Sequence, residues 1–426
     1  MPEKINHKIV PKEVVDSFIN LYKQGEFRQI LEKEKKFASF YQDSIEVLNI
    51  FGSNNLALQN FKRAITNFNK AIKLNPNIPT IYYNLGLAFH HIGNMDDAIV
   101  NYKKAIEIKP DYDEALNNMG MSLEEKGDVE GAIDKYNKVL ATNPNHAGAY
   151  YNLGNVFCSK DNLILAIQNY NKAISIKPDY AEAYYNMGIA LQKQGKIKEA
   201  IESYNKTLLL KPNYAQAYNN IGDALTRIIF KKPNRSLQNT ISSLLDKKFY
   251  VLPKDIAVAA ISLLKFEPSL QKQLKFVRFN KVIQNPLNIV KDLDELPLLR
   301  KLMSVCPLPD LELEKLFKQL RTSILENILS LEEAPPELLR FQSALALQCF
   351  TNEYIYSQSK SEEKAINVLE KKIKELLSNN EQPSPQMILT LASYKALHKY
   401  DWCQSLIVTN QIQDVFTRQV EEPNQE

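Results

Sequence analysis

Asparagine recurs at intervals of 34 residues through the middle of the chain, and a row of amides at such a spacing can bind a peptide backbone. Its members are Asn84, Asn118, Asn152, Asn186 and Asn220. A side-chain amide carries both hydrogen-bond donors and an acceptor, so it can pair with the main chain of an extended polypeptide whatever that polypeptide's side chains are. We call these residues the asparagine column. Duplication of one ancestral segment also produces such a column, so a polar surface without a ligand is the alternative interpretation.

A second column occupies the position before each of these asparagines. It consists of Tyr83, Asn117, Tyr151, Tyr185 and Asn219. Tyrosine rings beside amides add apolar contact and hydroxyl hydrogen bonds at a modest loss of conformational entropy. We call this set the tyrosine–asparagine column, and we predict that the two columns together bind an extended peptide.

Cysteine and histidine occur in patterns that do not favour a metal or catalytic site. The four cysteines are Cys158, Cys306, Cys349 and Cys403. They are scattered singly, with no Cys-x-x-Cys pair, which fits neither a zinc site nor a disulfide framework. His90 and His91 are adjacent, and neighbours on a helix point about 100° apart, so they would chelate a metal poorly. His398 and Cys403 share one expected helix or its end at a spacing that places imidazole and thiol on different faces. We predict no metal, no cofactor and no catalytic residue.

The C-terminal part of the chain lacks glycine, which excludes several kinds of enzyme site. All twelve glycines lie at or before Gly222, so the last 204 residues contain none. Sites for nucleotides, dinucleotides and methyl donors use glycine-rich loops to bring backbone amides against the ligand. Carboxylates such as Asp292, Asp294 and Glu332 lie in short mixed-charge stretches with no base or nucleophile beside them. The sequence therefore predicts that this chain is not an enzyme.

A basic series in the same part is the best candidate for contact with nucleic acid. Its members are Lys265, Lys272, Lys275, Arg278 and Lys281, with Phe266, Phe276 and Phe279 between them. An amphipathic helix with a solvated basic side explains the series equally well. The whole chain has 53 basic and 49 acidic residues and a formal net charge of +4, so bulk electrostatics does not indicate nucleic acid. We expect no nucleic-acid partner.

No apolar stretch is long enough to indicate a membrane segment. The longest run, residues 256–264, is far short of the ~20 residues that span a bilayer. No N-terminal stretch resembles a signal sequence. We predict a cytoplasmic protein without membrane contact.

The two columns are positioned by a repeat of constant length. Five segments of 34 residues follow one another without insertion or deletion: 45–78, 79–112, 113–146, 147–180 and 181–214. Position 8 is always glycine, position 20 alanine, position 24 aromatic and position 32 proline. Glycine and alanine let two helices approach closely, the ring fills the space that they leave, and proline separates one helix from the next. One repeat is therefore a helix, a tight turn and a second helix.

The tight turn is expected to vary between copies. Position 15 is Gly93, Gly127 or Gly195 in three copies, which suits a left-handed turn residue. Gln59 and Asp161 occupy it in the other two. We expect those two turns to be built differently.

This pattern resembles the tetratricopeptide repeat, whose signature is specific. The resemblance covers 45–230, with five full repeats and a half repeat at 215–230, while 1–44 read as a degenerate repeat that caps the array. It implies an all-α, right-handed α-α superhelix whose first helices line a concave, protein-binding surface. The asparagine column is similar to that in the repeats of O-linked N-acetylglucosamine transferase. Tetratricopeptide domains that grip chaperone C-termini carry lysine before the asparagine, and its absence here disfavours that role.

Residues 236–426 are helical by pattern, and prolines divide them into segments, so we expect a compact all-α region of seven to nine helices. Stretches 299–312 and 341–350 resemble a helical segment that, in some bacterial proteins, lies between tetratricopeptide repeats and an S-adenosylmethionine-dependent methyltransferase domain. That resemblance implies a truncated member, a fragment or a free-standing adaptor, because the sequence ends at Glu426 where such a domain would begin. The methyltransferase activity itself does not carry over, because no strand and glycine-rich loop precede a helix here.

The sequence thus favours a non-catalytic scaffold that binds extended polypeptide in a groove lined by the two columns. The alternative is the substrate-recruiting part of an S-adenosylmethionine-dependent methyltransferase, or of another transferase, whose catalytic domain is absent from this chain. Both interpretations predict protein or peptide partners, and neither determines the oligomeric state.

Overall fold

The computed structural model describes residues 10–37, 41, 43–226, 228–247, 250–279, 283, 285–331, 333–354 and 356–424. Every regular element in these ranges is a helix, which confirms the predicted all-α class. No helix among them combines the length and the apolar character needed to cross a bilayer. The chain divides into two compact units, Met1–Lys196 and Ile197–Glu426, which we describe separately. The domain boundary expected between 230 and 236 stays a prediction.

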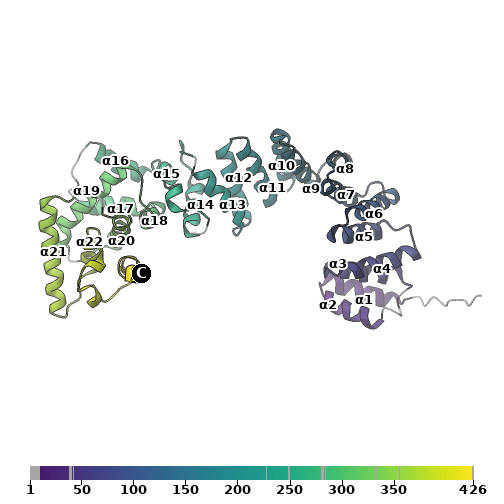
Figure 1. Ribbon diagram of the computed structural model, residues 1–426, viewed down its shortest axis with the longest axis horizontal. Helices are drawn as coiled ribbons and strands as arrows, with labels where there is room; N and C mark the ends of the chain where they lie inside the picture. Colours follow the sequence, from purple (N-terminus) through teal and green to yellow (C-terminus); the bar gives the residue numbers. More distant parts are fainter. Residues whose placement is uncertain are drawn as a thin grey trace, which may run out of the picture. The chain divides into compact units, whose positions relative to one another are not determined.

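The first unit is a stack of consecutive helix pairs (Figure 1). Its helices are α1 (Lys12–Lys23), α2 (Phe27–Phe37), α3 (Ile45–Ala57), α4 (Phe61–Leu74), α5 (Pro79–His91), α6 (Met95–Ile108), α7 (Asp113–Lys126), α8 (Val129–Thr142), α9 (Ala147–Ser159), α10 (Leu163–Ile176) and α11 (Ala181–Lys193). From α3 onwards, each first helix begins at position 1 of its 34-residue segment and each second helix at position 17. The helical solenoid expected from the period is confirmed.

Local capping residues explain the constant start of the second helices. Asn94, Asp128 and Asn162 precede α6, α8 and α10, and each side chain accepts a hydrogen bond from a backbone N–H in the first turn. Such a bond satisfies one of the N–H groups that lack a partner at a helix N-terminus. The turn and the helix start are therefore encoded within a few residues of each other.

The two helices of a repeat touch where the glycine of position 8 meets the ring of position 24. A β-carbon added at Gly154 would lie only 2.5 Å from Cε1 of Tyr170. Tyr170 is 1% exposed, and Ala166 at position 20 is fully buried. The same contact occurs between Gly86 and Tyr102, two repeats earlier in the chain. The small residues therefore permit the close approach that the sequence predicted.

The expectation that two turns differ from the others is wrong. Gln59 and Asp161 have φ angles of 59° and 58°, in the left-handed region occupied by Gly93, Gly127 and Gly195. The packing of both flanking helices determines the backbone at this position, so the turn keeps its shape when the residue has a side chain. A non-glycine residue there costs roughly 1–2 kcal/mol.

The second unit consists of helices of uneven length followed by a C-terminal stretch of single turns (Figure 1). Its helices are α12 (Ile197–Leu210), α13 (Ala215–Leu225), α14 (Arg235–Asp246), α15 (Pro253–Leu264), α16 (Pro268–Arg278), α17 (Pro286–Asp294), α18 (Pro297–Val305), α19 (Leu311–Asn327), α20 (Pro336–Thr351), α21 (Lys360–Ser378), α22 (Pro385–Ala392) and α23 (Gln413–Phe416). From α14 onwards the described ranges contain ten α-helices, more than the seven to nine expected. Six of them begin at proline, which favours the first helical position because its fixed φ suits a helix and its missing N–H has no partner there.

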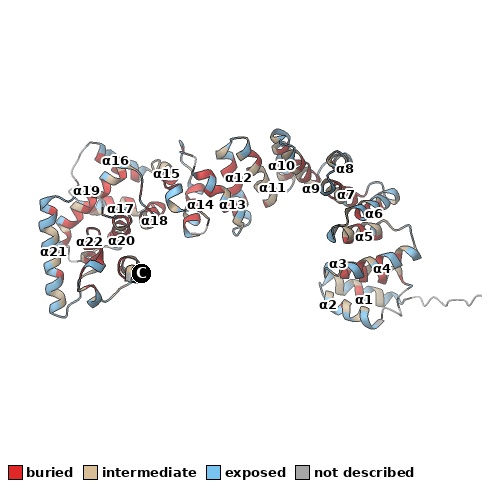
Figure 2. Cartoon of the chain, viewed as in Figure 1, coloured by how far each residue is buried: buried red, intermediate tan, exposed pale blue. Residues whose placement is uncertain are grey.

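The core of the second unit lies between these helices. Figure 2 shows buried residues on the faces that helices turn toward each other and exposed residues on the outside. Leu299 and Leu302 of α18 and Phe341 of α20 are fully buried, and the two helices are in contact.

Candidate functional site

The first helices of the first unit form one continuous layer. Helix α5 contacts α3 and α7, and α9 contacts α7 and α11. We call the surface of this layer the first-helix face. Eight of the ten predicted peptide-binding residues lie on α5, α7, α9 and α11; Asn219 and Asn220 lie on α13 of the second unit.

Within the first unit the two columns bond to each other across neighbouring repeats. Nδ2 of Asn118 donates to the hydroxyl of Tyr83 (3.1 Å), and Nδ2 of Asn186 donates to the hydroxyl of Tyr151 (3.0 Å). Where asparagine replaces tyrosine, Oδ1 of Asn117 accepts the same bond from Asn152 (3.1 Å). Each asparagine is therefore oriented by the preceding repeat. The sequence analysis missed this link, although its signal, a constant separation of 35 residues, was present.

The first member of the asparagine column bonds differently. Nδ2 of Asn84 lies 3.4 Å from the hydroxyl of Ser53, its hydrogen-bond acceptor. Asn49, which precedes the column in the first repeat, has a buried Oδ1 without a hydrogen-bond partner. The inter-repeat link thus begins with the Asn118–Tyr83 pair.

The tyrosines of the second column are half-buried, because they also pack against other rings. The ring of Tyr83 lies 6.1 Å from that of Tyr102 and 5.2 Å from that of Tyr112. Burial, together with the carboxylate of Glu114, raises the pKa of Tyr83. Tyr151 repeats the arrangement in the fourth repeat, 4.9 Å from Tyr180. These rings therefore support the layer as well as lining its surface.

The asparagines retain acceptor capacity for a ligand. The bonds of Asn84, Asn152 and Asn186 to described residues use only their N–H groups. Their three Oδ1 atoms are not fully enclosed oxygens that lack a hydrogen-bond partner. Three amide carbonyls with fixed orientation are thus available on the first-helix face to accept backbone N–H groups.

His90 and His91 lie at the end of α5, in the layer of first helices, and both side chains contribute to packing. Nδ1 of His90 lies 2.9 Å from the hydroxyl of Ser122, and Nε2 lies 3.4 Å from Oε1 of Glu125. Ser122 is fully buried, so this serine, histidine and carboxylate do not present a nucleophile to a substrate. His91 instead stacks on Phe61, with 5.3 Å between ring centroids. Over the described ranges, no three potential ligands gather into a metal site.

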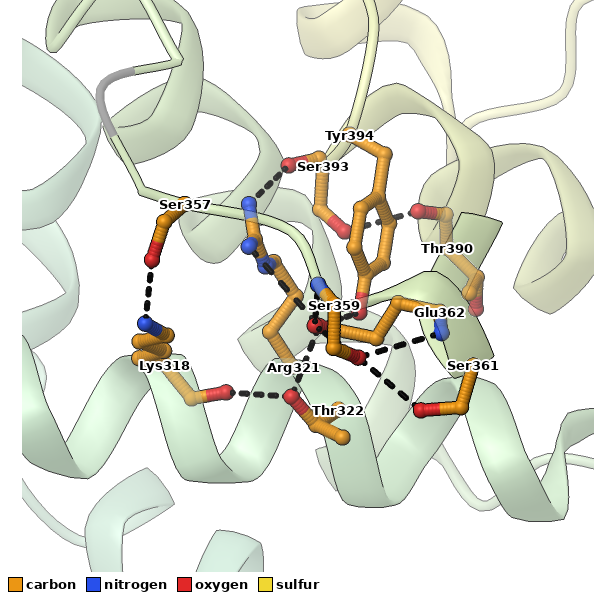
Figure 3. A network of polar contacts seen from close by, with 10 residues as sticks. All are labelled: Lys318, Arg321, Thr322, Ser357, Ser359, Ser361, Glu362, Thr390, Ser393 and Tyr394. Carbon is orange, nitrogen blue, oxygen red and sulfur yellow. Dashed lines mark hydrogen bonds and ion pairs between the residues drawn. The ribbon is translucent and has the colours of Figure 1, made fainter. Parts of the chain in front are cut away.

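The most concentrated polar cluster of the second unit is a buried ion pair (Figure 3). The guanidinium of Arg321 lies 4.1 Å from the ring centre of Tyr394, and its Nη2 is 3.9 Å from Oε1 of Glu362. Glu362 accepts hydrogen bonds from Tyr394 (3.0 Å) and Thr322 (2.8 Å). The pair is almost fully buried and joins α19, α21 and the end of α22, so we interpret it as structural.

The buried cysteines Cys349 and Cys403 of the second unit are not activated. Burial raises the pKa of Cys349 to about 12, although Arg321 acts in the opposite direction. Burial also raises the pKa of Cys403. His398 bonds through Nδ1 to the backbone oxygen of Gln419 (2.9 Å). A thiol that stays protonated at neutral pH is a poor nucleophile.

Ion pairs neutralise much of the basic series. Lys265 pairs with Asp310 and Glu312, Lys272 pairs with Asp292, and Arg278 pairs with Glu312. Lys281, like the acidic residue Glu332, lies outside the described residues. The carboxylates come from positions 20 to 47 residues away, so the sequence pattern alone could not reveal them. This arrangement favours an amphipathic helix with paired charges over a phosphate-binding surface.

Comparisons with known proteins identify the repeats. Tetratricopeptide repeat profiles match residues 79–112, 181–214 and 101–134, and a further TPR repeat profile matches 55–93, 122–161 and 154–195. In a sequence comparison, no curated protein matches this chain. Among solved structures, MamA is 32% identical and covers 39% of this chain and 96% of its own, with a TM-score of 0.36.

Two further solved structures share lower identity. YrrB, described as a TPR protein with an unusual peptide-binding site, is 22% identical and covers 42% of this chain and 91% of its own, with a TM-score of 0.34. PilF of Pseudomonas aeruginosa is 17% identical and covers 52% of this chain and 96% of its own, with a TM-score of 0.42. The profiles confirm the predicted repeats. The likeness to O-linked N-acetylglucosamine transferase and to a methyltransferase-associated segment stays a prediction.

Proposed function

We propose that this chain, whose residues 55–214 match tetratricopeptide repeat profiles, is a non-catalytic scaffold that binds extended polypeptide along the first-helix face. Interaction with proteins is the general role of such repeats. The specific part of the proposal is that the asparagine column binds the main chain of the partner.

The observation that carries this proposal is the fixed orientation of the amides. Asn118, Asn152 and Asn186 each donate to the preceding repeat. Since their orientation is set before a ligand arrives, binding costs little additional side-chain entropy, which otherwise amounts to about 0.5–1.5 kcal/mol per ordered side chain. Backbone recognition of this kind tolerates many partner sequences.

The length of the surface defines a suitable probe. Packed helices lie roughly 8–10 Å apart, so the four first helices α5 to α11 extend over roughly 30 Å. An extended chain covers this distance with about nine residues at roughly 3.3 Å each. A fluorescein-labelled peptide of about this length, repeating alanine, serine and glutamine, is a neutral probe without fixed structure.

The test separates ligand binding from stability, because the same amides serve both. Replacing Asn118, Asn152 and Asn186 together with alanine removes the amides and the inter-repeat bonds, each worth about 0.5–1.5 kcal/mol. The matched control, Tyr83→Phe with Tyr151→Phe, breaks two of the same bonds and keeps the amides. We expect lower melting temperatures for both variants and, in fluorescence anisotropy, a clearly larger loss of probe affinity for the triple variant than for the double tyrosine variant.

Equal binding of the probe by the wild type and the triple variant, both folded by circular dichroism, would contradict the proposal. The alternative, recruitment of substrate for an S-adenosylmethionine-dependent methyltransferase or another transferase, stays a prediction. Co-purification of such an enzyme with the full chain, lost in the triple variant, would support it. The predicted cytoplasmic location likewise stays a prediction.

A further inference from the structure

Charge is segregated between the two helix layers of the first unit. The five first helices α3, α5, α7, α9 and α11 carry six carboxylates and two lysines. The four second helices α4, α6, α8 and α10 carry five carboxylates and nine basic residues. The first-helix layer therefore has a net charge of −4 and the second-helix layer a net charge of +4. A ligand on the first-helix face experiences a negative surface.

Helix α7 supplies most of this negative charge. Four of the six carboxylates, Asp113, Glu114, Glu124 and Glu125, lie on it. Its one lysine, Lys126, pairs with Asp96 of the second-helix layer. The other lysine of the first helices, Lys193, is exposed at the end of α11. The centre of the layer is thus acidic, and among the described residues neither of these lysines pairs with a carboxylate of α7.

Glu124 is one of the carboxylates on α7. It is half-buried, and its Oε2 accepts a hydrogen bond from the hydroxyl of Tyr136 at 3.1 Å. Throughout the described part of the chain, no cation pairs with it. Burial, reinforced by neighbouring Glu125, raises its pKa. A half-buried anion of this kind is stabilised by a cation that replaces its lost hydration.

A second, independent feature of the same region is the hydroxyl of Tyr102. Tyr102 is fully buried, and among described residues its hydroxyl has no hydrogen-bond partner. Burial first, and then Tyr83 and Glu125, raise its pKa. Tyr136 occupies the same position one repeat later and donates to Glu124, whose equivalent in the repeat of Tyr102 is His90. Nε2 of His90 lies 3.4 Å from Oε1 of Glu125. A buried polar group left unpaired costs about 1–3 kcal/mol, which a polar ligand group can offset.

Resting on the proposed polypeptide-binding function, we propose that the partner is a basic extended segment and that Glu124 determines this preference by binding a lysine or arginine side chain. The asparagine column binds the main chain, and the carboxylates of α7 select the side chain that projects beside it. Charge complementarity favours a basic segment over an acidic one because the surface has a net charge of −4.

The test uses the full chain and three labelled peptides that differ only in charge. The neutral probe described above is compared with peptides in which lysine or glutamate replaces every glutamine. We expect the lysine peptide to bind at least about fivefold more tightly than the neutral one at low salt, and this advantage to shrink as salt screens the charges. The salt dependence of the wild type provides a readout independent of any variant.

The variant Glu124→Gln removes the charge while its amide oxygen can still accept from Tyr136. We expect it to lose most of the preference for the lysine peptide over the neutral peptide. Its matched control is Glu107→Gln, which removes one exposed carboxylate from α6 in the second-helix layer and should leave all three affinities unchanged. Circular dichroism verifies folding of both.

The outcomes distinguish the two proposals. Equal affinities of the three peptides for the wild type would overturn the basic-partner inference and leave polypeptide binding intact. A lysine preference that survives in Glu124→Gln would overturn the role of Glu124. If none of the peptides binds, the proposed function fails, and this inference fails with it.

Discussion

The contact between glycine at position 8 and the ring at position 24 predicts opposite effects for two glycine substitutions in one helix. Gly154 and Gly148 both lie on α9. A β-carbon at Gly154 would lie 2.5, 2.6 and 3.0 Å from three carbons of the Tyr170 ring. At Gly148 the nearest atom is Cε1 of His146, at 3.2 Å, on a side chain at the helix start.

The magnitude follows from the size of the overlap. Carbon atoms normally approach to about 3.5–4.0 Å, so the ring or the helix must move by about 1 Å in Gly154→Ala. Overpacking of this kind costs about 1–3 kcal/mol. Alanine in place of helical glycine gains about 1 kcal/mol in both variants. The difference between the two variants, about 1–3 kcal/mol, therefore measures the packing contact itself.

The assay is thermal unfolding of both variants, followed by circular dichroism. One kcal/mol corresponds to about 2–4 °C in a unit of this size. We expect Gly154→Ala to melt several degrees below Gly148→Ala, which should be at or above the wild type. If the two variants shift the melting temperature equally, the reasoning about close helix contact is wrong.

Three further predictions concern single residues. Gln59→Gly should raise the free energy of unfolding, measured by urea titration, by about 1 kcal/mol, because glycine adopts the left-handed φ of 59° without the strain that a side chain causes. A lower free energy of unfolding would refute this strain argument. Glu362→Gln should lower that free energy by about 3 kcal/mol by leaving the buried Arg321 without its carboxylate, whereas an unchanged value would show that the pair is dispensable. The hydrogen bond from Arg278 lowers the pKa of Glu312 to about 2, against an ordinary value of 4.5. The ionised Glu312 carboxylate therefore stabilises the fold fully above pH 4.5, and this stabilisation is lost as the pH falls toward 2. The wild type should lose more stability over this range than Glu312→Gln, and equal losses in the two proteins would contradict the prediction.

Much of the solenoid could be predicted because its signals are local and repeated. Proline at Pro79 and capping side chains such as Asn94 and Asp128 determine helix starts through contacts within one turn. Position 8 and position 24 lie sixteen residues apart in every copy, so their pairing was readable from the period. From α14 onwards the second unit has no such period, which is why short helices such as α23 were missed.

The sequence by itself determined the all-α class, the positions of the repeated helices and the identity of both columns. The same pattern occurs in five consecutive copies, so a helix assignment that is weak in one copy is supported by the other four. Only the tertiary structure decided how those residues are used. It showed that Asn118 and Asn186 bond to tyrosines of the preceding repeat, that Gln59 adopts the glycine conformation, and that Glu124 is a half-buried acid without a cation. These properties depend on which groups from distant positions meet in space. The energy of a polar group follows from those neighbours and from its burial, and neither is a property of the local sequence.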